Sequence, residues 1–146
     1  MKIVIVGSVE HADKIIKMSD RLEEMGHKTE IPHTVLRIKN GEFSLEYFRK
    51  MKNRDGGDYK FRKKSKVNYI KRYFDLIKKS DAILVLNVTK NGIRNYIGGN
   101  ALMELGFAHV LGKKIYLYNS IPKMSYSDEI KDVNPKVIYQ NLKKIK

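Results

Sequence analysis

Three stretches of almost unbroken apolar residues stand out along the chain, at residues 2–7, 81–88 and 113–119. Runs of this kind are typical of parallel strands that helices cover on both faces. Two shorter stretches, residues 27–32 and 135–139, are weaker strand candidates. The apolar pattern therefore predicts five strands.

Between these strands, apolar side chains recur three and four positions apart, which is the spacing of one helix face. The segments with this spacing are residues 11–25, 66–79 and 100–111. Strands that alternate with helices predict a doubly wound α/β fold, flavodoxin-like or Rossmann-like, with a five-stranded parallel sheet in the order 2-1-3-4-5. No internal repeat or linker divides the sequence, so we expect residues 1–146 to form a single domain.

The stretch 34–65 shows the weakest pattern, and we expect a short helix near residues 44–51 followed by a mobile loop around 55–58. Residues 49–72 hold eleven Lys or Arg and two Asp, a net charge of +9 within a chain of formal charge +14. A basic insertion at about 49–65 could attract a small phosphorylated substrate or bind nucleic acid. It could equally be a solvated, lysine-rich surface.

Composition narrows the classes of function. The chain has no cysteine, which excludes disulfides and thiolate metal sites and favours a reducing cytoplasm. Its four histidines lack metal-ligand spacing, and no apolar run approaches the roughly 18 residues of a membrane span. Neither a dinucleotide-binding glycine motif, a Walker A loop nor a G-x-S-x-G nucleophile elbow is present. We therefore expect no metal, no cofactor and no membrane partner.

In doubly wound folds, ligands bind beyond the carboxyl ends of the strands, where the strand order reverses. Small or polar residues follow four of the predicted strands, and they are Gly7 and Ser8, His33, Asn87, and Asn119. The loop after the third strand then leads to the turn Gly98-Gly99-Asn100 and to Glu104. These residues are candidates for substrate binding at one edge of the sheet.

Glu104 is an unusual residue for its position, because every residue from 101 to 111 is apolar or glycine except Glu104 and His109. Removing a carboxylate from water is costly unless it is hydrogen-bonded or its pKa rises. The helix dipole would explain an exposed acid in a first turn, but it explains an acid between apolar neighbours poorly. The pattern therefore favours a catalytic carboxylate.

The segment MELGFA at 103–108, after a glycine-containing turn, resembles the nucleoside 2-deoxyribosyltransferase superfamily. That superfamily includes the 2'-deoxynucleoside 5'-phosphate N-hydrolases. The resemblance extends along most of the chain and leaves out the basic residues 49–65. The other segments that carry it are 5–9, 22–35, 77–88 and 112–119.

The resemblance implies a role for several residues. Glu104 would be the nucleophile that attacks the anomeric carbon of the sugar, while Asp81 would belong to the catalytic network or serve structurally at the start of a strand. Where relatives carry an aspartate for base protonation, this chain has Tyr73.

Ser8, next to Gly7, matches a position of the superfamily that contacts phosphate or sugar. Apart from the resemblance, the start of a helix attracts anions, so Asn100 and the backbone at Gly98 and Gly99 could hold a phosphate, and Asn100 could equally be the N-cap of the helix. His33 could contact the base or be a half-buried structural histidine, and Arg94 could bind phosphate or ribose.

The expected activity is N-glycosidic bond cleavage of a nucleoside 5'-monophosphate, by hydrolysis or deoxyribosyl transfer. The positive charge favours an anionic substrate, so we favour the hydrolysis of a monophosphate. The resemblance also implies a homodimer, with residues 125–130 reaching a neighbour's pocket. Two alternatives stay open, a nucleotide-binding module without turnover and a nucleic-acid-binding protein that uses residues 49–72.

Overall fold

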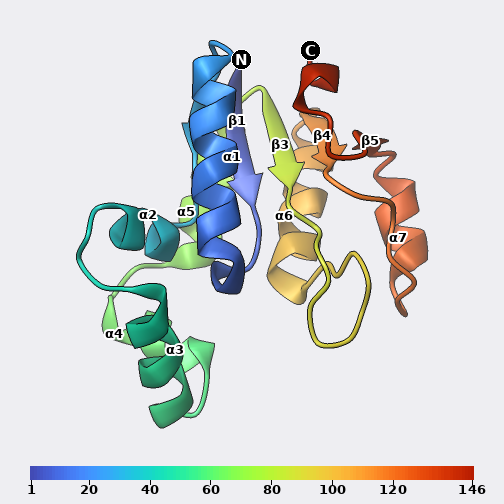
Figure 1. The fold of residues 1–146 in the computed structure, drawn as a ribbon. Coiled ribbons are helices and arrows are strands. Elements are labelled where there is room, and N and C mark those ends of the chain that lie inside the picture. Colours follow the sequence, from blue (N-terminus) through green and yellow to red (C-terminus); the bar gives the residue numbers. More distant parts are fainter.

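The computed structural model describes the backbone of residues 1–146 and every side chain except that of Asp58. A five-stranded sheet with the order β2-β1-β3-β4-β5 forms its centre (Figure 1). All four neighbouring pairs are parallel, so the predicted doubly wound α/β fold and its strand order are confirmed. The strands are β1 (Lys2–Val6), β2 (Lys28–Glu30), β3 (Ala82–Val85), β4 (Lys114–Leu117) and β5 (Lys136–Val137).

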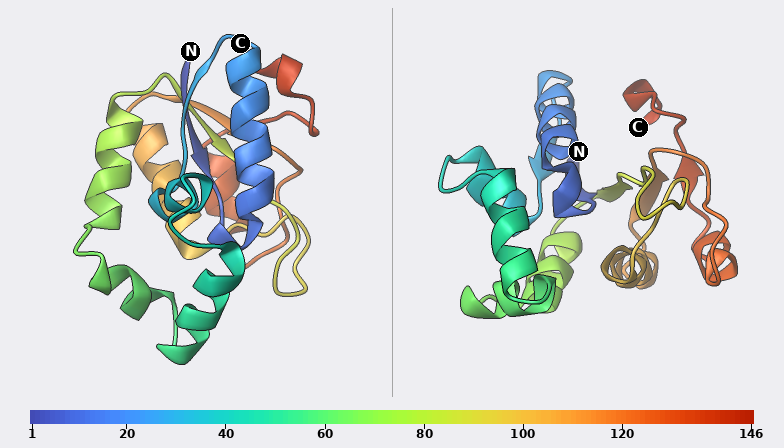
Figure 2. Two further views of the ribbon diagram at one scale, coloured as in Figure 1. Left: turned by 60° about the vertical axis from the view of Figure 1, so that its left-hand side comes forward. Right: turned by 60° about the horizontal axis from the view of Figure 1, so that its bottom comes forward.

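Helices cover both faces of this sheet, which explains why its central strands are apolar throughout. Alternate residues of β1 enter two separate cores: Ile3 and Ile5 pack in one cluster, and Val4 and Val6 pack in the other. Figure 2 shows α1 on one side of the sheet and α5, α6 and α7 on the other. Their bounds are α1 (Ala12–Glu24), α5 (Tyr69–Lys78), α6 (Gly99–Val110) and α7 (Ser127–Asp132).

The second strand is shorter than the sequence predicted. It ends at Glu30, and His33 is the first residue of α2 (His33–Lys39). Pro32 precedes this helix and has no backbone N–H to donate to a neighbouring strand, so the ladder cannot continue through it. His33 therefore lies at the start of a helix at the carboxyl edge of the sheet.

The short helix predicted near residues 44–51 is confirmed, and the basic insertion holds a second helix where the sequence predicted a loop. These two helices are α3 (Leu45–Arg54) and α4 (Asp58–Lys64), so the loop expected around residues 55–58 is reduced to a short turn. The Ser44 side chain accepts a hydrogen bond from the Tyr47 N–H and begins α3. The buried ring of Phe48 packs edge-to-face on Phe61 with centroids 5.0 Å apart, and this contact joins the two helices.

Two short 3-10 helices complete the chain. The first, η1 (Val9–His11), follows β1, and Glu10 on it pairs with Arg49 of α3, with 2.7 Å between Oε2 and Nε. This ion pair attaches the insertion to the carboxyl edge of the sheet. The second, η2 (Leu142–Lys144), packs Leu142 against the α1 side of the core. Among the described helices, none combines the length and apolar character that crossing a membrane requires.

Candidate active site

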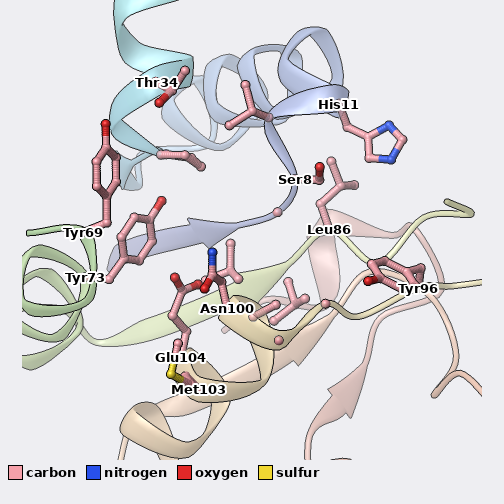
Figure 3. A pocket seen from close by; sticks show the side chains of 18 of the residues that line it. Ser8, His11, Thr34, Tyr69, Tyr73, Leu86, Tyr96, Asn100, Met103 and Glu104 are labelled. Carbon is pink, nitrogen blue, oxygen red and sulfur yellow. The ribbon is translucent and has the colours of Figure 1, made fainter. Parts of the chain in front are cut away.

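A cavity of about 270 Å³ opens at the carboxyl edge of the sheet (Figure 3). The loop after β1, the loop between β3 and α6, and the first turns of α6 form one part of its wall. Residues 32–34, α4 and α5 form the other part. The cavity therefore lies where ligands bind in doubly wound folds, beyond the strands at the point where their order reverses.

Glu104 extends from the second turn of α6 into this cavity, and Figure 3 shows its carboxyl group facing Tyr73 and Asn100. Among the lining residues that the structure describes, it is the only acid. Burial raises the pKa of its carboxyl group from 4.5 to about 8. The rest of α6 is less buried than the sequence suggested: Leu105 and Ala108 are fully enclosed, whereas Met103 is 40% exposed.

Tyr73 approaches Glu104 from α5, the neighbouring helix. Its side chain is only 5% exposed, and no described residue forms a hydrogen bond with its buried hydroxyl group. Burial raises the pKa of this hydroxyl well above its usual value, and the negative charge of Glu104 raises it further. Tyr73 therefore keeps its proton, and its hydroxyl group faces the cavity as a donor without a hydrogen-bond partner in the described residues. Buried polar groups without a partner are rare in folded proteins, which makes Tyr73 a candidate for contact with a ligand.

Ser8 and Lys90 mark one end of the cavity. The Lys90 ammonium donates a hydrogen bond to Ser8 Oγ at 2.7 Å, and the same oxygen accepts one from the Glu10 N–H at 3.3 Å. Lys90 is held in a tight hairpin in which its backbone exchanges two hydrogen bonds with Ile93. Asn91 and Gly92 form the tip, with φ angles of 52° and 71°, so the Asn-Gly pair positions the lysine.

Tyr96 links this lysine to the N-terminus of α6: the Lys90 ammonium lies 5.9 Å from the centre of the Tyr96 ring, and the ring lies against Gly98. Gly98 is the N-cap residue and provides no side-chain cap, so the first N–H groups of α6 remain available for an anion. A Cβ atom on Gly98 would come within 3.2 Å of the Tyr96 ring, which explains the glycine. Asn100 is the second residue of the helix and lines the cavity, so it is not the N-cap that an asparagine there suggested.

Aromatic and basic side chains form the opposite end of the cavity. The rings of His33 and Tyr69 lie 5.9 Å apart, and the guanidinium group of Arg62 lies 5.6 Å from the centre of the Tyr69 ring. Burial lowers the pKa of His33, and the nearby charge of Arg72 lowers it further, so the imidazole is neutral at pH 7. The planes of the two rings are tilted by 53°, and aromatic faces of this kind suit contact with a planar ligand.

Asp81 lies at the other edge of the sheet, directly before the amino end of β3. Its Oδ2 accepts a hydrogen bond from the Lys2 N–H at 2.7 Å, and its own N–H donates to the Lys2 carbonyl at 2.8 Å. It does not belong to the described residues that line the cavity. Of the two roles expected for Asp81, the contacts match the structural one: this carboxylate joins the beginnings of β1 and β3.

Asn87 and Asn119 follow their strands as predicted but bind each other instead of facing the cavity. The Asn87 amide donates to the carbonyl groups of Asn119 and Ser120, at 3.0 and 2.9 Å, and its Oδ1 accepts the Asn119 N–H at 2.8 Å. Arg94 is exposed near the hairpin tip and also lies outside the described lining. The structure therefore does not place these three residues as predicted. Asn87 and Asn119 hold two loops together, and Arg94 lies on the surface.

Gly7, Ser8, Tyr73, His33, Gly98, Gly99, Asn100 and Glu104 do come together around the cavity. Sequence reasoning missed Lys90 and Arg62, although the Asn-Gly turn beside Lys90 was a detectable hairpin signal. Arg62 had no such signal, because it enters the site from the insertion. Tyr126, in the segment expected to reach a neighbouring subunit, donates a hydrogen bond to the Ile97 carbonyl of its own chain.

Comparisons of this chain with models of protein families, with curated proteins and with solved structures give no match. The described residues contain no group of three or more His, Cys, Asp or Glu placed to hold a metal ion. The geometry and chemistry of the cavity are therefore the basis for assigning a function.

Proposed function

We propose that this protein cleaves the N-glycosidic bond of a nucleoside 5'-monophosphate, with Glu104 as the nucleophile. The observation that carries the proposal is the position of Glu104, an acid of raised pKa between a cationic end and an aromatic end of one cavity. The resemblance of residues 103–108 to the nucleoside 2-deoxyribosyltransferase superfamily points to the same chemistry. Hydrolysis and transfer of the deoxyribosyl group to another base are the two forms of this activity.

A nucleoside monophosphate matches the order of groups along the cavity. Its phosphate would lie at the end formed by Ser8, Lys90 and the N-terminus of α6, where a hydroxyl, an ammonium and backbone N–H groups gather. Its base would lie against Tyr69 at the aromatic end. Its sugar would then lie over Glu104, halfway between the two.

In the first step, the ionised carboxylate of Glu104 attacks the anomeric carbon and the bond from that carbon to the base breaks. The bonding electrons go to the base, and Tyr73 supplies the proton that the departing nitrogen needs. Positive charge develops on the sugar in this step, and the carboxylate beneath it stabilises that charge. The products are a glycosyl ester on Glu104, the free base and a tyrosinate.

In the second step, water attacks the anomeric carbon, gives its proton to the Tyr73 tyrosinate and releases Glu104. The changing charge of Glu104 helps Tyr73 to give up its proton in the first step and to regain one in the second. Ionised Glu104 raises the pKa of Tyr73, and forming the ester removes that negative charge. Tyr73 is thus a better acid at the moment when the base departs.

The raised pKa of Glu104 also sets the pH dependence. With a pKa of about 8, only about a tenth of the protein carries the ionised nucleophile at pH 7. Base release should therefore rise about tenfold per pH unit at acidic pH and level off near pH 8. An activity that is independent of pH between 6 and 8 would contradict the role of Glu104 as a nucleophile of high pKa.

A nucleotide-binding module without turnover is the second candidate. It is favoured by the protonation of Glu104, since a neutral carboxyl group beside Tyr73 can donate a hydrogen bond to a ligand without attacking it. Such a module would bind a monophosphate tightly and release no base.

The deciding experiment incubates the protein with a panel of ribo- and deoxyribonucleoside monophosphates and measures free base by chromatography. Glu104→Gln should lower the release of base about a thousandfold or more, because it removes the nucleophile but keeps the size of the side chain. Glu24→Gln is the matched control, since Glu24 is an exposed acid on α1 outside the described lining of the cavity, and it should retain full activity.

Three results would overturn or redirect the proposal. Full activity of Glu104→Gln would exclude the glutamate mechanism. Binding of a nucleotide without release of base from any member of the panel would establish the binding module. Tyr73→Phe tests whether Tyr73 protonates the departing base. The variant should slow the release of base most for bases that leave poorly without a proton. An equal effect on every base would contradict that role.

A further inference from the structure

One residue that lines the cavity near Ser8 has no part in the proposed reaction. His11 is the last residue of η1, and its backbone N–H donates to the Ser8 carbonyl at 2.9 Å. Its imidazole ring belongs to the cavity lining, and Figure 3 shows the ring on the same side as Tyr96, away from Tyr73. His11 therefore borders the end of the cavity that would hold the phosphate group.

The Nε2 atom of the His11 ring is buried, and no described residue forms a hydrogen bond with it. Buried polar atoms in folded proteins nearly always have a partner, so this nitrogen indicates that a ligand supplies one. An imidazole nitrogen accepts a hydrogen bond when it is unprotonated and donates one when it carries a proton. The oxygens of an ionised phosphate only accept, so they pair with Nε2 when it carries a proton.

The charges around His11 are mostly positive. Burial lowers the pKa of the imidazole most, and the nearby charges of Lys14 on α1, Lys90 on the hairpin and Arg49 on α3 lower it further. The carboxylate of Glu10 raises this pKa, but it already pairs with Arg49 at 2.7 Å. Without a bound anion, His11 is therefore neutral at pH 7.

A bound phosphate group changes this balance of charge. A terminal phosphate monoester carries about 1.5 to 2 negative charges at pH 7, because its second pKa is near 6. A phosphodiester carries about one negative charge, since it has no second proton to lose. The Lys90 ammonium can balance one negative charge, and protonation of His11 balances the second.

We propose that His11 is a phosphate ligand that takes up a proton as the substrate binds, and that it thereby selects a terminal phosphate monoester over a phosphodiester. The inference rests on the proposed function for the position of the phosphate group. In the complex, the imidazolium Nε2–H donates to a phosphate oxygen, and the proton that the ring gains comes from the solvent. The site would thus take a free nucleotide and reject nucleotides inside a nucleic-acid strand, whose phosphates are diesters.

The first measurement compares a nucleoside 5'-monophosphate with the 5'-methyl phosphodiester of the same nucleoside. Binding is measured at pH 7 in the Glu104→Gln background, where the base stays attached and no carboxyl group titrates at this position. The monoester should bind about tenfold more tightly than the diester, because it alone gains the charged hydrogen bond from His11.

The variant His11→Gln keeps a hydrogen-bond donor but cannot become charged. It should weaken binding of the monoester about tenfold and leave binding of the diester within about twofold. His109→Gln is the matched control, since His109 is an exposed histidine on α6 outside the described lining, and it should change neither affinity. Equal affinities for the two ligands, or equal losses in the two variants, would overturn the inference.

Proton uptake gives a readout that an uncharged contact would not change. Calorimetry at pH 7 in two buffers with different heats of ionisation should show uptake of about half a proton or more per monoester bound. The magnetic resonance signal of the His11 ring should titrate at least about one pH unit higher when the monoester is bound. This signal is measured with His11 in place, so it decides the question even where the variant fails to fold. Unchanged titration of His11, or uptake that persists in His11→Gln, would overturn the inference.

The two proposals fail separately. If the monoester binds with proton uptake by His11 but loses no base when Glu104 is intact, the N-glycosidase proposal fails and the phosphate site stands. If base is released while the titration of His11 does not respond to the monoester, the proposed activity stands and His11 is not a phosphate ligand.

Discussion

The two edges of the sheet use a carboxylate in opposite ways. At the amino edge, Asp81 is exposed to water and accepts a hydrogen bond from the Lys2 backbone. At the carboxyl edge, Glu104 enters a cavity where burial raises its pKa to about 8 and where no hydrogen bond from a described residue reaches it. Asp81 is placed for stability, whereas Glu104 occupies a position that costs stability.

The difference follows from the geometry of parallel strands. At the amino edge, β1 and β3 begin side by side, so the Asp81 carboxylate lies within reach of the Lys2 backbone N–H. At the carboxyl edge, the chain leaves β1 and β3 in diverging directions and opens a cavity. An acid of raised pKa in such a place is a candidate for function, because folding alone gives no reason to retain it.

The largest expected effect concerns the free energy of unfolding, which the buried carboxyl group of Glu104 lowers. Below pH 4.5 the carboxyl group is protonated in both the folded and the unfolded chain. Between pH 4.5 and about 8 the unfolded chain has lost this proton and the folded chain retains it, so the free energy of unfolding falls as pH rises. Glu104→Gln should therefore stabilise the protein by about 4 kcal/mol at pH 8 relative to pH 4.5.

Denaturant unfolding at several pH values measures this difference, with Glu24→Gln as the control for an exposed acid. The gap between Glu104→Gln and the unchanged protein should widen steadily up to pH 8 and then stay constant. A constant gap from pH 5 to pH 8 would mean that water or a counter-charge already satisfies Glu104, and the contrast with Asp81 would disappear.

A smaller effect tests whether Lys90 binds the phosphate group directly or only adds positive charge to its loop. Lys90→Met removes the ammonium group beside Ser8 and should raise the KM for a monophosphate about tenfold, while a nucleoside without phosphate keeps its KM. Arg94→Met removes an equal charge from the same loop, outside the described lining, and should change neither value by more than about twofold. Equal losses in both variants would indicate general attraction instead of a phosphate site.

The sheet was predictable from sequence because its signal is local. The strands β1, β3 and β4 are covered on both faces, so each reads as an apolar run wherever it lies in the fold. The strand order followed from the alternation of strands and helices. The helix α4 was not predictable in this way, because its residues are mostly charged and it is held by contacts such as Phe48 with Phe61.

The site was predictable only where it depends on strand order. Ser8 was placed correctly because it follows the end of β1, and Glu104 because the loop after β3 leads into α6 at the same edge. Asn87 follows a strand end as well, yet its side chain turns inward to fasten the loop after β4. Strand order specifies the edge on which a residue lies, but the direction of a side chain depends on hydrogen bonds that form only in the folded chain.

The smallest expected effect concerns Asp81 at the amino edge of the sheet. Asp81→Ala removes the acceptor for the Lys2 N–H, a bond exposed to water, and should lower the free energy of unfolding by about 1 kcal/mol. Base release should stay within about twofold, because the four residues of β3 separate Asp81 from the loop that leads to the cavity. Thermal unfolding and the base-release assay on the same preparation check both values. A large loss of activity without a loss of stability would return Asp81 to the catalytic network and would mean that the two edges of the sheet are coupled.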